Sequence, residues 1–401
     1  MPSPLSEQKA TAIAGAILFV NTLDFMMVMP MGPYFSQALH FPEAQLGWVG
    51  GSYTFAAAFA GLAASFFLDR FDRRKALAVT VLGLVIGTVA GAFATSFHSM
   101  LAARVLAGCF GGPAASVAIS ILTDVVEPQH RGRAMGRAMT SFSVSAVLGV
   151  PAGLYLAQLG GWRMPFFAVA ALGLVVGVIS VALLPPLRGH VAKAKQRSHR
   201  DHFELLKDPA VGLALLCTAV AMYSAFSLIP NFPAFLIHNL GVPPEHLGVL
   251  YAIGGSFSVI TLLLTGPLVD KVGVMKVTVA GTLIFLVALI AMFATDHALL
   301  PVWALFIVFM MGTGIRNVTN QAQNSKVPLP EQRAGFQSLN NASQHLASAV
   351  GAVASTLFLT SAPDGHLQGL QQVALLSGAV ALSYPFLAVN LEKRLKKRGE
   401  R

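Results

Sequence analysis

The sequence is poor in charge and nearly free of cysteine. Charged residues make up 11% of its 401 positions, whereas a typical soluble domain carries roughly 25%. The two cysteines, Cys109 and Cys217, both lie inside apolar runs, so neither a disulfide framework nor a cysteine metal site can be built from them. The phosphate loop of nucleotide hydrolases and the His-Glu-x-x-His zinc motif are also absent. We therefore expect no internal ATP motor, no bound metal and no cofactor.

Long apolar runs make up most of the chain. Hydrophobic residues account for 55% of it, and a helix needs about 20 mostly apolar residues to cross a bilayer. Membrane-spanning β-strands would alternate in polarity over about ten residues, but these runs are continuously apolar, so we predict helices. The sequence contains twelve such runs: 10–36, 45–68, 76–96, 99–123, 135–158, 163–185, 210–237, 246–269, 275–295, 299–323, 334–360 and 370–390.

The chain is predicted to consist of two related halves. Residues 1–185 are the expected N-terminal six-helix bundle, 186–209 a polar and basic cytoplasmic linker, and 210–401 the C-terminal six-helix bundle with a basic tail. Asp69 after the second run and Asp270 after the eighth lie 201 positions apart in similar surroundings. A second pair of similar stretches, around Arg131 and Arg333, has an offset of 202. Two matches at nearly one offset indicate a duplicated six-helix unit.

The positive charges predict the orientation. If the N-terminus is cytoplasmic, 24 of the 27 Lys and Arg residues fall in cytoplasmic segments, and only Arg163 falls on the other side. Arg104 and Arg316 lie inside spans. This asymmetry follows the positive-inside rule and predicts two cytoplasmic termini. Because the basic residues would lie beside an anionic leaflet, the net charge of +10 does not indicate a nucleic-acid partner.

Several motifs resemble those of the major facilitator superfamily, and within it the twelve-span drug and sugar efflux proton antiporters, over essentially the whole chain. The signature after the second span, Gly-x-x-x-Asp-Arg/Lys-x-Gly-x-Arg/Lys-Arg/Lys, corresponds here to 65–75, with Ser65 and Asp72 in place of the glycines. Arg104 and Gly108 match a fourth-span signature. The other matches are an antiport-type motif in the fifth span, present in part as Gly149, Pro151 and Gly153, and a first-span aspartate followed by prolines, as Asp24, Pro30 and Pro33.

This resemblance implies an all-α membrane protein with the major facilitator fold, in which twelve helices form two pseudo-symmetric bundles. It implies a multi-pass protein of the cell inner membrane, with a proton gradient as the driving force. We expect a monomer, because a single twelve-helix chain already encloses a cavity. The resemblance also implies that Asp69 lies between the two halves, as part of a gate that closes the cytoplasmic side. The predicted gate residues are Asp69, Arg70, Arg73, Arg74, Asp124, Arg131, Asp270 and Lys271. The alternative is a solvated charge cluster that only fixes the topology.

One acidic residue, Asp24, falls deep inside a predicted span. Counting helical rise from the ends of the runs places Asp24 at roughly 21 Å and Arg104 at roughly 22 Å above the cytoplasmic edge of a 30 Å slab. We therefore hypothesise an Asp24–Arg104 interaction that loads and releases a proton, because burial favours the neutral acid and an arginine favours the carboxylate. The alternative is a structural ion pair. His345, near the middle of the eleventh run, is a second proton-coupling candidate or a hydrogen-bonded packing residue.

Polar residues inside other spans predict the solute cavity. Arg316 starts a polar stripe on the tenth run, which faces either the cavity or another helix, because facing lipid is costly. In the cavity, Arg316 would anchor an anionic or hydroxyl-rich solute; otherwise the stripe is an interhelical hydrogen-bond network. First-span methionines suit an adaptable apolar pocket or ordinary packing. The predicted cavity residues are Asn21, Met27, Tyr223, Asn231, Arg316, Asn317, Asn320, Asn341 and Gln344.

These patterns predict a secondary active transporter with alternating access. Its partners are expected to be a small solute, protons and the lipid bilayer. The predicted activity is proton-coupled efflux of an amphipathic drug-like or sugar-like solute, of the multidrug type. A uniporter or a proton symporter of a small metabolite remains the alternative. A membrane-embedded enzyme is disfavoured, because the deep titratable residues, Asp24 and His345, form no hydrolytic set.

Overall fold

The computed structural model is almost entirely helical, and its contacts divide it into two compact units. Unit 1 comprises Met1–Phe41 and Ser52–His199, and unit 2 comprises Pro42–Gly51 and Arg200–Arg401. Most of the predicted linker lies outside the described residues, so the predicted domain boundaries stay a prediction. The described residues are 5–67, 70–127, 129–187, 205–293, 300–329 and 332–399.

Ten helical segments of the described chain are long and apolar enough to cross a membrane. Two further helices, α3 (Leu46–Phe67) and α16 (Arg333–Ser355), are 22 and 23 residues long. The α3 helix is mostly apolar, whereas α16 is less so because it carries several amide side chains. The twelve together match the twelve predicted runs and confirm the predicted all-α fold class.

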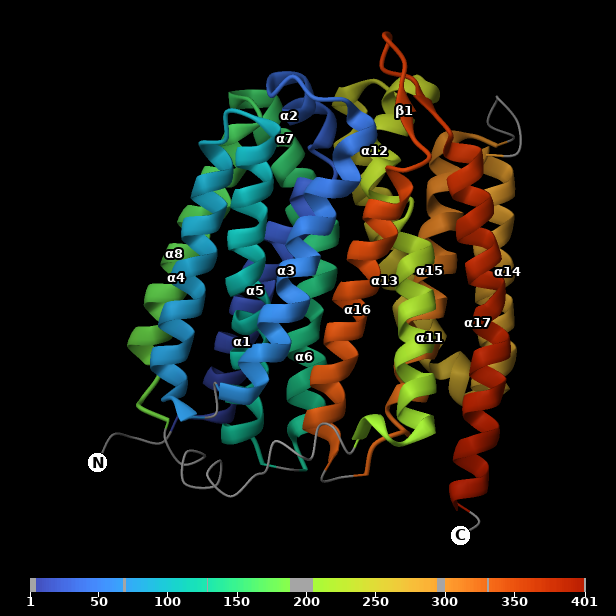
Figure 1. The fold of residues 1–401 in the computed structure, drawn as a ribbon. Coiled ribbons are helices and arrows are strands. Elements are labelled where there is room, and N and C mark those ends of the chain that lie inside the picture. The colour runs from blue at the N-terminus through green and yellow to red at the C-terminus, as the bar shows by residue number, and fades with distance from the viewer. Residues whose placement is uncertain are drawn as a thin grey trace. The chain divides into compact units, whose positions relative to one another are not determined.

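Unit 1 contains six spans, and two of them are interrupted. The first predicted run breaks between Val28 and Gly32, beside Pro30, because proline lacks the N–H that would continue the helix. The fifth contains a π-helical turn, Ser145–Gly149. The helices are α1 (Glu7–Val28), α2 (Gly32–Ala38), the main part of α3, α4 (Arg73–Ala92), α5 (Phe97–Val125), α6 (Arg131–Val144), α7 (Val150–Gly160) and α8 (Arg163–Leu183) (Figure 1).

Polar caps fix where the helices of unit 1 begin. The Ser6 side chain accepts a hydrogen bond from the Lys9 backbone at the start of α1, and Ser96 forms a capping box with Ser99 at the start of α5. Asp72, which stands where the family signature has glycine, caps α4 by accepting from the Arg74 backbone N–H at 2.9 Å. The Asp72 substitution therefore supplies a helix cap.

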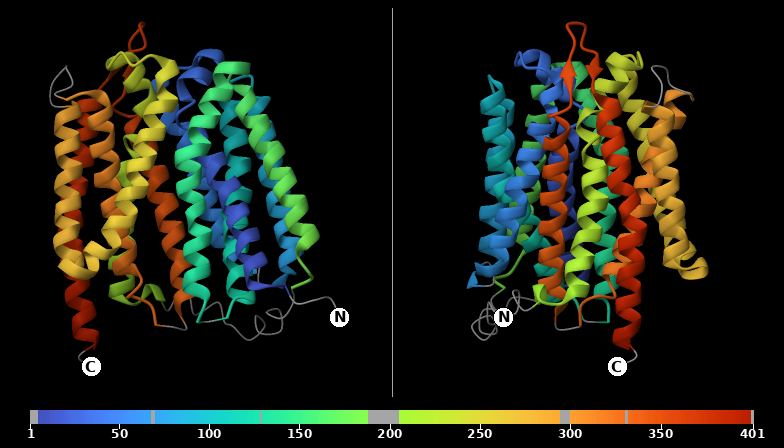
Figure 2. Two further views of the ribbon diagram at one scale, coloured as in Figure 1. Left: turned by 180° about the vertical axis from the view of Figure 1, so that it is seen from behind. Right: turned by 45° about the vertical axis from the view of Figure 1, so that its right-hand side comes forward.

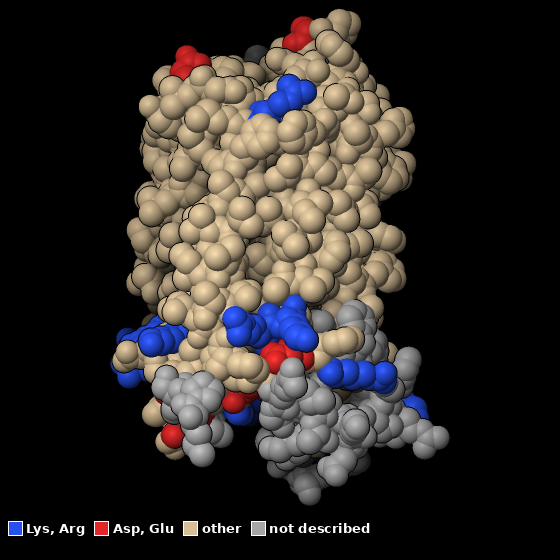
Figure 3. Space-filling model, turned by 90° about the vertical axis from the view of Figure 1, so that its left-hand side faces the viewer, with Lys and Arg blue, Asp and Glu red and all other residues tan. Residues whose placement is uncertain are grey.

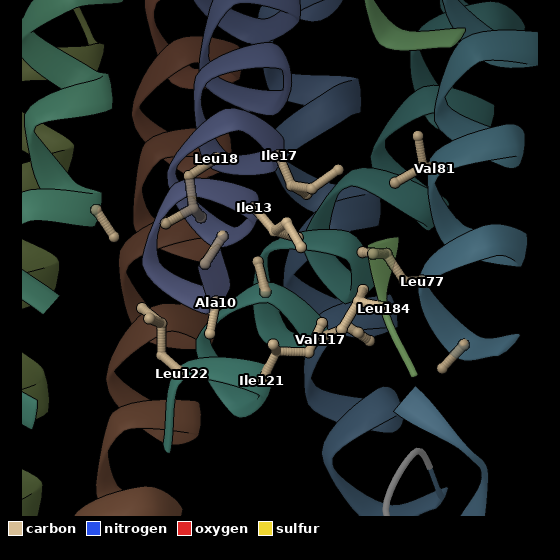
Figure 4. Close-up of a cluster of buried hydrophobic side chains, with 14 of the residues drawn as sticks. Ala10, Ile13, Ile17, Leu18, Leu77, Val81, Val117, Ile121, Leu122 and Leu184 are labelled. Atoms are coloured by element: carbon tan, nitrogen blue, oxygen red, sulfur yellow. The ribbon is translucent and has the colours of Figure 1, made fainter. Parts of the chain in front are cut away.

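An apolar core fills unit 1 between α1, α4, α5 and α8. Ala10, Ile13 and Ile17 of α1 pack with Leu77 and Val117, which come from α4 and α5 (Figure 4). Glycines bring these helices close together. A Cβ built on Gly87 would lie 2.5 Å from the backbone nitrogen of Ala107, so α4 and α5 touch backbone to backbone there.

Replacing Gly87 by alanine should lower the melting temperature of the purified protein by several degrees, because the new methyl group meets the α5 backbone rather than a movable side chain. Overpacking of this kind typically costs about 1–3 kcal/mol. Gly136→Ala on α6 is the matched control, because a Cβ there meets nothing within 4 Å. Equal melting temperatures for the two variants would contradict this account of the α4–α5 contact.

Unit 2 has the same plan with more breaks. The seventh predicted run is interrupted near Pro230 and Pro233. The helices are α11 (Pro209–Phe226), η4 (Ile229–Asn231), α12 (Phe232–Ala234), η5 (Phe235–Asn239), η6 (Pro244–His246), α13 (Leu247–Val272), α14 (Val274–Phe293), α15 (Val302–Asn324), α16 and α17 (Leu370–Gly399).

A short antiparallel hairpin joins α16 to α17. β1 (Thr360–Ser361) pairs with β2 (Leu367–Gln368), with Ser361 opposite Leu367. The hairpin projects beyond the helices of unit 2 (Figure 2). Asn239 of η5 holds it through two reciprocal hydrogen bonds of 3.0 Å with the backbone of Leu367. In the loop, the backbone N–H of His366 donates to Asp364 and holds the pKa of that carboxyl below its ordinary value.

A segment from the first half of the sequence, Pro42–Gly51, belongs to unit 2, and we call it the crossing segment. It includes η1 (Glu43–Gln45) and the start of α3. Glu43 contacts His238 of η5 at 3.1 Å, and both side chains are largely buried. Ala44 donates its backbone N–H to Ser361 at 3.0 Å. Gly47 lies so close to the carbonyl of Ala352 that no larger residue fits.

Candidate functional site

The strongest candidate site in unit 1 is a buried ion pair between α1 and α5. Asp24 is 0% exposed and Arg104 is 1% exposed. Arg104 Nη1 lies 3.1 Å from Asp24 Oδ2 and 3.4 Å from Oδ1. Arg104 Nη2 also donates to the Asp24 backbone carbonyl at 3.5 Å. The contact is therefore direct, without a bridging water.

Three further residues surround this pair. Thr88 of α4 donates its hydroxyl to Asp24 Oδ1 at 2.7 Å. The Tyr53 ring lies under the guanidinium of Arg104, at 4.5 Å from ring centroid to Cζ, a favourable cation–π arrangement. The Tyr53 hydroxyl donates to Asn21 Oδ1 at 3.0 Å. Asn21, predicted as a cavity residue, thus joins the Asp24–Arg104 group, whereas Thr88 and Tyr53 carried no signal in the sequence.

The antiport-type motif packs against the turn of α1 that carries Asp24. A Cβ on Gly149 would lie 2.5 Å from Leu23 Cδ1, and one on Gly153 would lie 3.6 Å from Met27 Cβ. Met27 is 1% exposed and belongs to this packing. Pro151 lies in the first turn of α7, directly after the π-helical turn. Turns of this kind are frequent at functional sites.

In unit 2, a second buried arginine has no carboxylate partner among the described residues. Arg316 of α15 is 1% exposed. Its Nη2 donates to the Ser224 hydroxyl on α11 at 2.8 Å. Its guanidinium lies 4.5 Å from the Phe285 ring centroid and 5.5 Å from that of Tyr384. Its Nε and Nη1 atoms have no hydrogen-bond partner in the described part of the chain.

Buried amides extend this polar group along α15. The Thr218 hydroxyl donates to Asn340 Oδ1 at 2.7 Å and accepts from Asn320 and Asn324, each at 2.9 Å. Gln323 is 2% exposed, and neither its nitrogen nor its oxygen has a partner among the described residues. Arg316 and Asn320 hydrogen-bond to α11, and Gln323 shares their face of α15. We call Ser224, Arg316, Asn320 and Gln323 the α11–α15 seam.

The other predicted cavity residues lie apart from this seam. Asn231 donates to Ser355 at 3.0 Å. Tyr223 lines a shallow apolar hollow of about 390 Å³. The remaining members are partly exposed on their helices: Asn317 accepts from Gln321, Asn341 accepts from Gln337, and Gln344 lies half-buried on α16. His345, the second proton-coupling candidate, is also half-buried on α16, and its role stays a prediction.

Some of the predicted gate residues meet at one end of unit 1. Arg73 Nε lies 2.9 Å from Asp124 Oδ2, and Arg73 is 4% exposed. Arg131 Nε donates to the Val126 carbonyl at 3.1 Å. Arg70 is exposed, and Arg74 contributes its backbone N–H to the Asp72 cap. Asp69 lies outside the described residues.

Two gate residues lie in unit 2. Asp270 and Lys271 lie near the end of α13. Both are exposed, and neither forms an ion pair with another described residue.

A contact between Glu7 and the start of α6 in unit 1 was not predicted from the sequence. Glu7, at the start of α1, accepts from the Glu127 backbone at 2.8 Å and contacts His130 Nδ1 at 3.0 Å. These three side chains could approach one metal ion, but hydrogen bonds already engage the Glu7 carboxylate.

Comparisons with known proteins agree with this fold. The family model described as Major Facilitator Superfamily matches residues 14–352 and 214–400. Multidrug resistance protein 2 of Bacillus subtilis is 23% identical over 281 residues, which cover 68% of this chain and 70% of that protein. An uncharacterised MFS-type transporter of the same organism, YceJ, is 23% identical over 96% of both chains.

Solved structures show the same architecture. A bacterial homologue of the human lysosomal transporter Spinster, in an inward-facing and unoccupied conformation, superposes with a TM-score of 0.78 at 17% identity over 99% of both chains. The nucleoside transporter NupG gives a TM-score of 0.74 at 14% identity, covering 95% of this chain and 99% of that one. The twelve-helix fold, the family model and these transporters together exclude an enzyme: the chain belongs to the major facilitator superfamily and is a multi-pass membrane transporter of small solutes.

Proposed function

We propose that this transporter exports a small amphipathic solute in exchange for protons. The observation that carries the proposal is the Asp24–Arg104 pair, fully buried and in contact at 3.1 Å. A charged side chain inside a bilayer costs roughly 2.5–3.5 kcal/mol or more, and such residues commonly mark ion or proton pathways. A carboxylate kept there with a single arginine and a threonine hydroxyl is suited to carrying one proton.

The surroundings of Asp24 provide the two states that coupling needs. In the described state, Arg104 and the Thr88 hydroxyl both stabilise the ionised carboxylate. If α5 withdrew Arg104 by a few ångströms, the same carboxyl would stay buried with the Thr88 hydroxyl but without a counter-charge, which favours its protonated form. The antiport-type motif packs against Leu23 and Met27 of the same α1 turn, so a shift of α7 would also move Asp24.

The direction of transport and the kind of solute are supported by relatives. The relative named multidrug resistance protein 2 covers about two thirds of the chain, and this supports efflux of drug-like solutes.

Met27, Met29 and Met31 are all buried within unit 1. We therefore place the solute at the polar residues of the spans and not in an apolar pocket formed by these methionines. We propose alternating access of a site near the middle of the membrane.

We also propose that the protein lies in the inner membrane as a monomer with both termini in the cytoplasm. Basic side chains gather mainly at one end of the face of unit 1 shown in Figure 3, as the positive-inside rule requires of the cytoplasmic end. Arg163, the predicted exception, donates to the carbonyls of Ala92 and Ala94 at the end of α4. Arg163 therefore satisfies the backbone carbonyls at the end of α4, which explains why an arginine lies on the side opposite to the other basic residues.

The test is transport in inverted membrane vesicles, with ethidium, Nile red and fluorescein as cationic, neutral and anionic probes. We expect saturable accumulation of at least one probe when the vesicle lumen is acidic, and its loss when a protonophore collapses the gradient. Saturable flux that is insensitive to the protonophore would indicate a uniporter instead. Accumulation driven by a gradient of the opposite sign would indicate a symporter.

A further inference from the structure

Two buried arginines within the described spans, Arg104 and Arg316, have different partners. Both are 1% exposed and both pack against aromatic rings. Arg104 has a carboxylate at 3.1 Å, whereas Arg316 has a serine hydroxyl and two unpartnered nitrogen atoms. A buried charge without a counter-charge is strongly destabilising. Arg316 therefore needs a negative charge that the described residues of unit 2 do not supply.

No described carboxylate of unit 2 forms an ion pair with Arg316. Within the described part of unit 2, the acidic residues occupy helix ends, turns or the crossing segment. They are Glu43, Asp208, Glu245, Asp270, Asp364 and Glu392. Among the described residues, the spans of unit 2 therefore carry the buried permanent cation Arg316 and no carboxylate paired with it.

Further unpartnered atoms lie on the same side of α15 as Arg316. Residues at i, i+4 and i+7 share one face of a helix, and Arg316, Asn320 and Gln323 have this spacing. Asn320 Oδ1 and both polar atoms of Gln323 have no partner among the described residues. From Arg316 to Gln323 the helix rises roughly 10 Å. The α11–α15 seam thus presents a cation at one end and free amide donors and acceptors at the other.

We propose that the α11–α15 seam binds a monoanionic ligand at Arg316, and that this anion is the carboxylate of the transported solute. The planar guanidinium offers parallel N–H donors that match a carboxylate. The rings of Phe285 and Tyr384 hold it in place, and the unpartnered amides would bind polar groups further along the solute. The assignment of the anion to the solute rests on the proposed transport function. An inorganic monoanion such as chloride offers the same chemistry, so the experiment must separate the two sources.

The experiment measures binding of radiolabelled benzoate to the purified full-length protein by scintillation proximity in chloride-free buffer. We expect saturable binding to the wild type. Arg316→Gln should weaken it about ten- to hundredfold, because a charge-assisted hydrogen bond is lost, and Arg316→Lys should weaken it less. Arg394→Gln, which removes an exposed arginine of α17, is the matched control and should bind as the wild type does. Gln323→Leu tests the amide end without changing the charge.

Benzoate binding, chloride binding and benzoate uptake together decide whether Arg316 binds an anion and which anion it is. Arg316-dependent benzoate binding, together with saturable benzoate uptake into inverted vesicles, supports the proposal. Labelled chloride that binds at Arg316 and displaces benzoate, with no benzoate uptake, would overturn the solute assignment in favour of an inorganic anion. Binding that Arg316→Gln and Arg316→Lys leave unchanged would overturn the site itself. Proton-driven ethidium transport that persists without any benzoate binding would sink this proposal and leave the proposed function standing.

Discussion

Replacing Asp24 by asparagine should reduce proton-driven transport to the level of empty vesicles. Asparagine has the shape of aspartate, and its Oδ1 can still accept the hydrogen bond from Thr88, but it cannot take up or release a proton. Exchange of labelled for unlabelled solute across the membrane needs no proton and should continue in this variant. The measurement is therefore a pair of assays, gradient-driven accumulation and solute exchange, on the same vesicles.

Asp364→Asn is the matched control for this substitution, because Asp364 is an exposed residue of the hairpin loop. It should show normal accumulation and normal exchange. Full pH-dependent accumulation by Asp24→Asn would disprove the coupling role of Asp24. Loss of both accumulation and exchange would point to a damaged fold, and the double variant described next resolves that case.

Replacing Arg104 by methionine should destabilise the protein by about 3–5 kcal/mol, because it leaves the Asp24 carboxylate buried without its partner. The double variant Asp24→Asn/Arg104→Met carries no buried charge at this site. It should recover most of that loss while remaining unable to use the proton gradient. Thermal unfolding of the wild type, both single variants and the double variant gives the coupling energy directly.

The control for charge loss alone is Arg137→Met, at an exposed position on α6, which should unfold at the wild-type temperature. If the two single-variant losses simply add in the double variant, Asp24 and Arg104 do not interact in the folded protein. Such additivity would also remove the physical basis for proton loading at this pair.

Composition and helix geometry were sufficient to predict the fold. A run of about 20 apolar residues has few stable solutions in a bilayer, so the number and type of spans follow from the sequence. The breaks are less predictable: the sequence predicts one continuous run from 10 to 36, but the chain departs from α-helix near Pro30. Several helices contain proline without a break, for example Pro113 within α5. The presence of a proline alone therefore does not predict whether a helix is interrupted.

The sequence predicts how deep each site residue lies along the membrane normal. It does not predict which neighbouring helix each side chain faces. Helical rise placed Asp24 and Arg104 at one depth, and the structure has them in contact. Which neighbours complete the cluster depends on how each helix is rotated, and the sequence does not contain that information. Thr88 and Tyr53 were missed for this reason, as was the contact between Gly149 and Leu23. The sequence also shows which residues of α15 are polar, but not which of their atoms lack hydrogen-bond partners.

The crossing segment makes unit 2 depend on residues from the first half of the sequence. Because Pro42–Gly51 packs with unit 2 while its neighbours on both sides pack with unit 1, the backbone passes between the units at three places rather than one. Cutting the chain after residue 199 would therefore not yield two self-sufficient fragments. The N-terminal fragment would carry Gly47 and Glu43 without the surfaces they fit, and the C-terminal fragment would lack a piece of its own interior. Fragments produced together should consequently find one another, whereas either one made alone should be prone to degradation.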